Sequence, residues 1–107
     1  PVTLIRGDLP KQVDYINSMV GSRERIGERA GILATDQTLD QYPKGIKLSM
    51  GDRSKPADLA GNLFVRLREF DDLNVDFILA EGVDVKGEGL AVMNRMARAA
   101  GFHIIDL

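Results

Sequence analysis

A carboxylate and two glycine-containing turns follow the most apolar short segment of the chain. Residues 77–80 (FILA) are succeeded by Glu81 and Gly82, and a polar loop leads to Gly87-Glu88-Gly89. In open α/β sheets, ligands and partners bind beyond the carboxyl ends of the strands, where glycine turns bring backbone donors close to a phosphate. We therefore expect any site in this region, with Glu81 as its candidate carboxylate.

Glu81 also has a structural interpretation, which we favour. It could accept hydrogen bonds from the backbone of residues 87–90, or it could pair with Arg95. The polar loop from Val83 to Glu88 supplies no combination of nucleophile, base and oxyanion donors.

Nucleotide chemistry is poorly supported. The turn after the first expected strand, residues 6–10 (RGDLP), holds one glycine, an anionic Asp8 that repels phosphate, and Pro10, which lacks an N–H donor. Gly87 and Gly89 supply only half of a dinucleotide fingerprint, and no Gly-Lys-Ser/Thr phosphate loop is present. We do not expect this chain to bind nicotinamide or flavin.

Other catalytic constellations are incomplete. Asp8 and Asp52 suit a phosphoacceptor receiver domain, but no lysine follows the last expected strand. His103 has no serine or carboxylate partner at a suitable spacing, so a hydrogen-bonded histidine at the domain edge is expected. Asp71 and Asp72 are adjacent on a helix and do not face each other, which disfavours a metal pair. No metal site is predicted.

The elements that must position these residues alternate regularly. Strands are expected at residues 2–5, 30–34, 46–50, 77–80 and 102–106, the third of them near a sheet edge. Helices are expected from Pro10 to about Val20, from Pro56 to about Asp72 with Ser54 as its cap, and over residues 90–100. Residues 36–42 read as a short helical turn, and residues 21–29 as a loop. The apolar face of the second helix comprises Leu59, Leu63, Phe64, Leu67 and Phe70.

The alternation of strands and helices predicts about five mainly parallel strands with helices on both faces. The expected fold is a three-layer α/β/α domain over residues 1–107.

Composition restricts the functional classes. The 107 residues carry a net charge of −2, which gives little attraction for nucleic acid, and no apolar run approaches a membrane span. The absence of cysteine suits a reducing cytosol, so a cytoplasmic location is expected. Because the chain begins at Pro1 in the middle of what reads as a strand, we interpret it as part of a longer protein.

Four segments in combination resemble a known family, the C-terminal domain of the two-domain threonylcarbamoyl-AMP synthases. They are residues 32–35 (ILAT), 48–53 (LSMGDR), 60–71 (AGNLFVRLREFD), and 80–82 (AEG) followed by 89–95 (GLAVMNR). The resemblance extends from about Val2 to Ile105. It implies a Rossmann-like fold, in agreement with the strand alternation.

The resemblance also implies a partner and a reaction. In that family a YrdC-like catalytic domain of the same polypeptide makes threonylcarbamoyl-adenylate from threonine, bicarbonate and ATP, for threonylcarbamoyladenosine in transfer RNA. ATP and a divalent cation would bind that domain, and no cofactor or catalytic residue is carried over to this chain. A linker with a Ser-Pro-Gly-Met motif joins the two domains in the family, and it is absent from this sequence.

We therefore expect a non-catalytic accessory domain that docks beside a catalytic domain and its linker. The candidate contacts combine family motifs with places beyond strand ends; they are Thr35, Ser49, Gly51, Asp52, Arg53, Glu81, Gly82, Gly89, Asn94 and Arg95. The alternatives are a free-standing domain that binds a small molecule or nucleotide in the same crevice, and an oligomerisation module.

Overall fold

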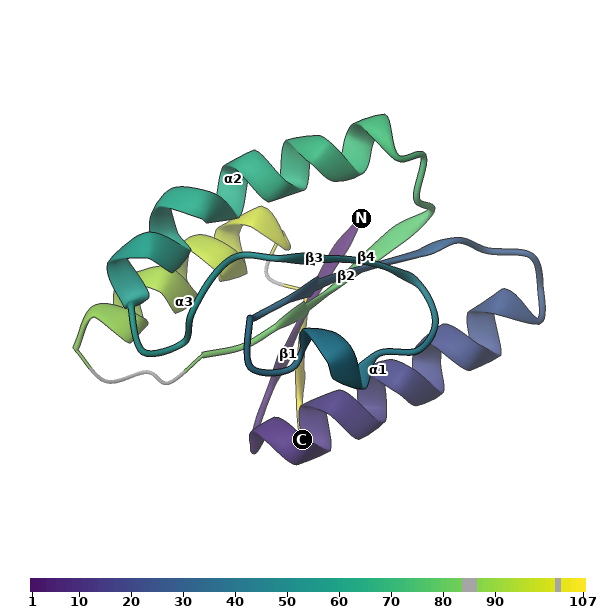
Figure 1. The fold of residues 1–107 in the computed structure, drawn as a ribbon, viewed down its shortest axis with the longest axis horizontal. Coiled ribbons are helices and arrows are strands. Elements are labelled where there is room, and N and C mark those ends of the chain that lie inside the picture. Colours follow the sequence, from purple (N-terminus) through teal and green to yellow (C-terminus); the bar gives the residue numbers. More distant parts are fainter. Residues whose placement is uncertain (84–86, 102) are drawn as a thin grey trace.

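The structure, a computed structural model, describes residues 1–83, 87–101 and 103–107. The elements in chain order are β1 (Val2–Arg6), α1 (Leu9–Glu24), β2 (Ala30–Ala34), the 3-10 turn η1 (Leu39–Gln41), β3 (Ile46–Ser49), α2 (Pro56–Asp72), β4 (Phe77–Glu81), α3 (Glu88–Ala99) and β5 (Ile104–Asp106). Figure 1 shows this order along the ribbon. The predicted alternation of strands and helices is confirmed. Of the expected loop 83–88 and the expected fifth strand, residues 84–86 and Phe102 lie outside the described residues.

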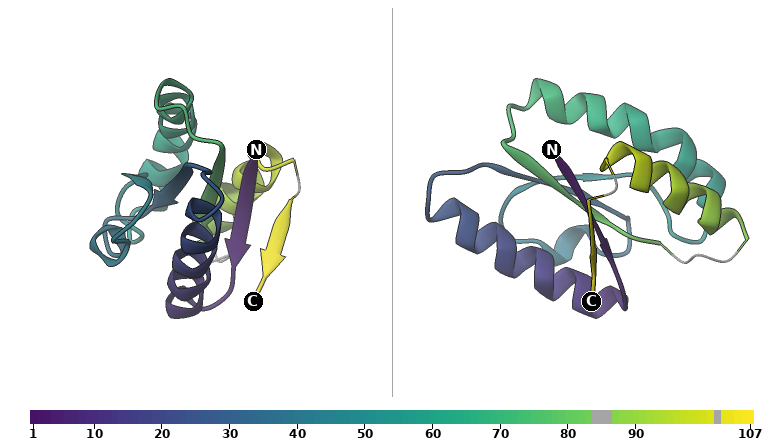
Figure 2. Two further views of the ribbon diagram at one scale, coloured as in Figure 1. Left: turned by 90° about the vertical axis from the view of Figure 1, so that its right-hand side faces the viewer. Right: turned by 180° about the vertical axis from the view of Figure 1, so that it is seen from behind.

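The five strands form one parallel sheet in the order β3-β2-β4-β1-β5. Helices α2 and α3 cover one face and α1 covers the other, and the views of Figures 1 and 2 separate these layers. The predicted three-layer α/β/α fold is confirmed, as is the edge position of β3. The order itself could not be read from the sequence, because alternation does not say which strands are neighbours.

Alternating side chains of the strands supply two apolar cores. Leu4, Leu33 and Ile78 point to the α2 and α3 face, whereas Ile5 and Ile32 point to the α1 face. This two-sided burial is typical of parallel sheets, whose strands are covered on both faces.

Helix α1 is longer than the sequence predicts. Its stripe of Val13, Ile16 and Val20 is buried as expected, but the helix continues into the expected loop 21–29 and ends at Glu24. The guanidinium of Arg23 lies 5.5 Å from the centre of the Phe77 ring on β4, a cation–π arrangement. This contact with the sheet gives the last turn a tertiary partner, which local sequence signals do not reveal.

Helix α2 begins and ends near the predicted residues, but two details of the prediction are wrong. Ser54 is not the cap, because the cap position is Lys55 and the Ser54 hydroxyl donates to Asp52 instead. Phe64, placed on the apolar face by its spacing, is 46% exposed, whereas Leu63 and Phe70 are buried.

A topological switch point lies between β1 and β4. The chain leaves β1 through α1 toward β2, on one face, and leaves β4 through α3 toward β5, on the other face. The two connections diverge and open a crevice beyond the carboxyl ends of these neighbouring strands, the place where open α/β sheets bind ligands.

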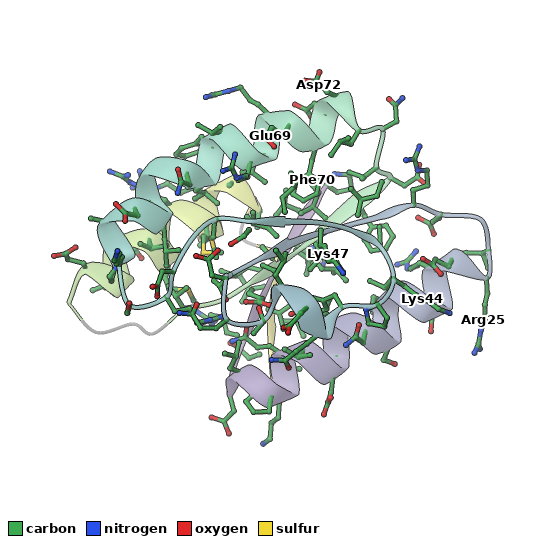
Figure 3. All side chains as sticks on the ribbon, in the orientation of Figure 1. Arg25, Lys44, Lys47, Glu69, Phe70 and Asp72 are labelled. Atoms are coloured by element: carbon green, nitrogen blue, oxygen red, sulfur yellow. The ribbon has the colours of Figure 1, made fainter. Side chains whose placement is uncertain are left out.

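Gly31 makes the close packing of α2 on β2 possible. A Cβ atom at Gly31 would stand 2.9 Å from two carbon atoms of the Phe70 ring, whose side chain points from α2 toward the sheet in Figure 3. Gly31→Ala is expected to lower the free energy of unfolding by about 1–3 kcal/mol through overpacking, measured by urea denaturation.

The matched control is Gly61→Ala on α2, where an added Cβ would meet nothing within 4 Å. Relative to glycine, alanine in a helix interior stabilises by roughly 0.5–1 kcal/mol. Equal stabilities for the two alanine variants would contradict this account of the β2–α2 contact.

Candidate functional site

Glu81 lies at the carboxyl end of the central strand β4, and its side chain has no solvent-exposed surface. An ionised carboxylate in such a place requires paired hydrogen-bond donors. Four side chains supply them, and they come from segments far apart in the sequence.

Three hydroxyl groups donate to the Glu81 carboxylate. Thr35 Oγ1 lies 2.9 Å from Oε1, Thr38 Oγ1 lies 2.5 Å from Oε2, and the Tyr42 hydroxyl also donates to Oε2. Thr35 follows directly on β2, Thr38 precedes η1, and Tyr42 follows η1. The carboxylate thus holds the β2–β3 connection against the end of β4.

Arg53 supplies the charge partner. Its Nη2 lies 3.0 Å from Glu81 Oε1 and 2.9 Å from the carbonyl oxygen of Gly82, and its Nε donates to Thr35 Oγ1 at 3.0 Å. The Arg53 side chain is 18% exposed, so it closes the network on the solvent side. With four donors on two oxygens, the carboxylate has no lone pair left for an outside group.

Tyr42 is a fully buried member of this network. Burial raises the pKa of its hydroxyl far above the ordinary value of 10, and the hydrogen bond to Glu81 raises that pKa further. The phenol therefore stays neutral and keeps donating to the carboxylate.

A second cluster fixes the turn between β3 and α2. The Asp52 carboxylate accepts from the Ser54 hydroxyl at 2.7 Å, from the Ser54 backbone N–H at 2.8 Å and from the Gln37 amide at 2.6 Å. The two Ser54 hydrogen bonds and then that of Gln37 lower the pKa of Asp52 to about 2. Gln37 also accepts from the Arg53 backbone N–H at 3.0 Å, which links this turn to the buried network.

The residues selected from the sequence fall into three groups. Thr35, Arg53, Glu81 and Gly82 meet in the buried network. Pairing with Arg95 was one of two alternatives for Glu81, and Glu81 pairs with Arg53 instead. Ser49, Gly51 and Asp52 belong to the adjoining turns, where Ser49 Oγ donates to Asp36 and accepts from the Gly51 N–H. Gly89 is buried on α3, whereas Asn94 and Arg95 are exposed there.

A pocket of about 400 Å³ opens at the switch point, next to the network. The loops after β1 and β4 and the first turn of α1 form its walls, and the residues lining it are Arg6, Gly7, Asp8, Leu9, Gln12, Arg53, Gly82, Val83 and Met93. Gly82 has to be glycine at this point, since a Cβ there would lie 2.6 Å from the Ile5 carbonyl oxygen. Arg53 lines this pocket and is also paired with the buried Glu81 carboxylate.

Sequence reasoning missed Tyr42, Thr38 and Gln12. Gln12 is buried and holds Gly82 from both sides, donating to its carbonyl oxygen and accepting from its N–H. A signal was present for Gln12, because it extends the i, i+4 stripe of Ile16 and Val20 with a polar residue. Tyr42 and Thr38 lie in a segment without periodicity and carried no such signal.

The remaining sequence candidates are structural in the described part of the chain. His103 is exposed, and its Nδ1 lies 3.0 Å from Thr3 Oγ1, as expected for a hydrogen-bonded histidine at the edge. Within residues 1–83, 87–101 and 103–107, no three His, Asp or Glu side chains cluster in a way that could hold a metal ion. No helix of these residues has both the length and the apolar character needed to cross a membrane.

The Glu81 network can be tested against a surface ion pair of the same chemistry. Glu81→Gln keeps the shape of the side chain but removes the negative charge that pairs with Arg53 and accepts from three hydroxyls. Breaking a buried ion pair costs about 3–5 kcal/mol of unfolding free energy. Asp106→Asn is the control, because Asp106 pairs with Arg6 at the surface, with 65% of its side chain exposed. Chemical denaturation should show a large loss for the first variant and little change for the second. Similar losses in both would contradict the importance of the buried network.

Tyr42 gives the fold a distinct response to alkaline pH. Because its folded pKa is raised above the unfolded value of 10, its contribution is complete below pH 10 and is lost as the pH rises toward the folded pKa. Above pH 10 the free energy of unfolding of the native chain should fall by up to about 1.4 kcal/mol per pH unit more than that of Tyr42→Phe. The measurement is urea denaturation from pH 8 to pH 12 at constant ionic strength. Tyr15→Phe, which removes the chain's other tyrosine hydroxyl, should show the same fall of unfolding free energy with pH as the native chain. If Tyr15→Phe removed the extra fall and Tyr42→Phe did not, Tyr42 would not be its cause.

Comparison with known proteins identifies the family. The family described as "Threonylcarbamoyl-AMP synthase, C-terminal domain" matches residues 1–101. The chain is 33% identical over 105 residues to a threonylcarbamoyl-AMP synthase of Bacillus subtilis and 36% identical over 106 residues to one of Pyrococcus abyssi. These matches cover 98% and 99% of this chain but only 29% of each relative.

Solved structures agree with the sequence comparisons. The crystal structure of P. abyssi Sua5 complexed with L-threonine superposes with a TM-score of 0.85 at 35% identity, covering 99% of this chain and 29% of that one. The structure of a C-terminal Sua5 domain from Pyrococcus horikoshii gives a TM-score of 0.78 at 30% identity, covering 99% of this chain and 95% of that one. The parallel sheet, the three helices and the matched sequence lead to one conclusion: the chain belongs to the family of threonylcarbamoyl-AMP synthase C-terminal domains.

Proposed function

We propose that this chain is the non-catalytic accessory domain of a cytoplasmic L-threonylcarbamoyladenylate synthase. It supports the formation of threonylcarbamoyl-AMP from threonine, bicarbonate and ATP, for threonylcarbamoyladenosine modification of tRNA. The observation that carries the proposal is the extent of the matches: they take in almost all of this chain and about 29% of relatives named threonylcarbamoyl-AMP synthase. The chemistry is assigned to the remainder, a YrdC-like catalytic domain that binds ATP and a divalent cation.

The state of the strand-end carboxylates supports an accessory role. Glu81 is buried and saturated by donors, and Asp52 is engaged by Ser54 and Gln37. The Glu81 carboxylate therefore has no open position for a proton transfer to substrate, and the three hydrogen bonds to Asp52 hold its Oδ1 atom in place. Their hydrogen bonds instead give the strand-end surface a fixed shape, which suits docking against another domain.

The exposed candidates define where that docking would occur. Asn94 and Arg95 belong to the Met-Asn-Arg segment of the family pattern, and both side chains are exposed on α3. They therefore lie where contact with the catalytic domain or its linker is proposed. Asp52 and Arg53, both partly exposed, extend the surface toward the pocket at the switch point.

Removal of the domain tests the proposal. The full-length synthase is compared with the same protein ending before residue 1, and threonylcarbamoyl-AMP formation is measured under identical conditions. We expect a loss of at least tenfold, because linker positioning would no longer be supported, and a tenfold loss corresponds to about 1.4 kcal/mol. Unchanged synthesis without the domain would overturn the accessory role.

A pair of variants on one helix tests the docking surface. Arg95→Ala in the full-length protein should reduce synthesis, whereas Arg98→Ala, also exposed but on the last turn of α3, should not. Thermal denaturation of both variants establishes that the domain remains folded. Equal activities would remove Arg95 from the proposed surface.

The pocket at the switch point supports a second candidate, a domain that binds a small molecule or nucleotide by itself. Its volume of about 400 Å³ lies within the range of ligand pockets. A ligand that binds only the folded state raises the melting temperature, so ATP or threonine should stabilise the isolated 107-residue chain in this case. The accessory role predicts little or no shift of the melting temperature with ATP or threonine.

A further inference from the structure

A second hollow lies on the α1 face of the sheet, apart from the strand-end crevice. It has a volume of about 330 Å³ and runs between α1 and strands β1, β4 and β5. Side chains of Tyr15 and Met19 form its α1 wall, and its floor includes Thr3, Phe77 and Ile105. We call this hollow the α1 groove.

The groove exists because the two faces of the sheet are unequally covered. Helices α2 and α3 pack against one face, whereas α1 alone packs against the other, chiefly over β2 and β4. Thr3 on β1 and Ile105 on β5 are therefore only partly buried, although Ile5 of β1 is fully buried in the α1-face core. Parallel sheets are normally covered on both faces, so the part of this layer beside β1 and β5 is less complete than the rest.

Apolar side chains at the groove are only partly buried. Tyr15, Met19, Phe77 and Ile105 pack against the buried α1-face core but keep surface open to solvent. An occupant that covered them would extend this core outward. Apolar area removed from water is the general driving force for such an association.

Charged groups around the groove already have partners within the domain. Arg23 pairs with Glu28 at 2.8 Å while lying over the Phe77 ring, and Asp76 accepts from the Arg29 backbone N–H at 2.6 Å. His103 is hydrogen-bonded to Thr3. The groove therefore offers apolar contact with a satisfied polar rim, which suits a polypeptide segment better than a small charged ligand.

The position of Pro1 indicates which polypeptide segment lies nearest to the α1 groove. Pro1 lines the groove, and its carbonyl oxygen accepts from the Ile78 N–H at 2.9 Å, which anchors the start of β1 there. The matched family region is C-terminal, and the relatives are more than three times as long as their matched part. Residues just before position 1 would begin at the groove, and a short tether gives an effective concentration in the millimolar range.

We propose that the segment preceding Pro1 in the full-length protein occupies the α1 groove and covers Met19, Phe77 and Ile105 with apolar side chains. The proposal rests on the proposed function, because it requires the linker between the catalytic domain and this one. It adds a second contact, on the opposite side of α1 from the Glu81 network. The linker would then be held at its C-terminal end by this domain.

The test compares the 107-residue chain with the same chain extended upstream through the encoded linker. The extension should raise the melting temperature by roughly 4 °C or more. In methyl NMR spectra the Met19 and Ile105 signals should shift and show contacts to linker residues. The buried Met96 methyl, on the other face of the sheet, should not change.

A variant pair separates groove binding from general stabilisation. Met19→Glu should abolish the gain in melting temperature on extension, whereas Leu90→Glu, at a 50% exposed apolar residue of α3, should preserve it. Only the difference between extended and short forms is compared, so the intrinsic cost of each substitution cancels.

Identical melting temperatures and methyl spectra for the short and extended chains would overturn the proposal. A concentration-dependent dimer of the short chain that shifts the Met19 signal and persists in the extended chain would overturn it too, by assigning the groove to a second copy. Neither readout involves synthesis of the adenylate. Failure here together with loss of activity on domain removal would reject the groove assignment and leave the accessory function standing.

Discussion

The fold is organised around the need to satisfy one buried carboxylate. Glu81 ends the central strand with no exposed surface, and it is ion-paired with Arg53 and receives three hydroxyl donors. Removing a charge from water costs several kcal/mol, which only well-placed partners offset. The segment after β2 and the turn before α2 must therefore converge on the end of β4. The hydrogen bonds of the Glu81 carboxylate thus fix the path of these two connections, which have little regular secondary structure.

This demand also explains why the strand-end crevice differs from that of a typical α/β enzyme. In such enzymes, polar groups beyond the strands remain open toward the ligand. Here the central carboxylate is closed over by Arg53, and Gln12 occupies both backbone groups of Gly82. The Glu81 carboxylate and the backbone groups of Gly82 therefore make their hydrogen bonds inside the domain. What remains toward solvent is the pocket of about 400 Å³, bordered by this hydrogen-bonded surface.

The sequence predicts the parts of this structure that depend on local patterns. The strands, the helices and the importance of Glu81 follow from periodicity and from the position of a carboxylate after an apolar run. The partner of Glu81 did not follow, because Arg53 is 28 residues away and reaches it through the strand order β3-β2-β4. Tyr42 and Thr38 lie around a short 3-10 turn whose conformation depends on that same tertiary network. Long-range pairing was the missing information in each case.

The unequal covering of the sheet is the feature on which the proposed contact with the preceding segment rests. A parallel sheet this small needs apolar cover on both faces, and α1 alone leaves Thr3 and Ile105 beside an open groove. The Glu81 network lies on this same face but at the carboxyl ends of the strands, where η1 and Arg53 seal it. One end of the face is thus completed by the domain's own polar side chains, while the other is left apolar. If the preceding segment covers that apolar end, the position of the linker is coupled to the stability of this domain.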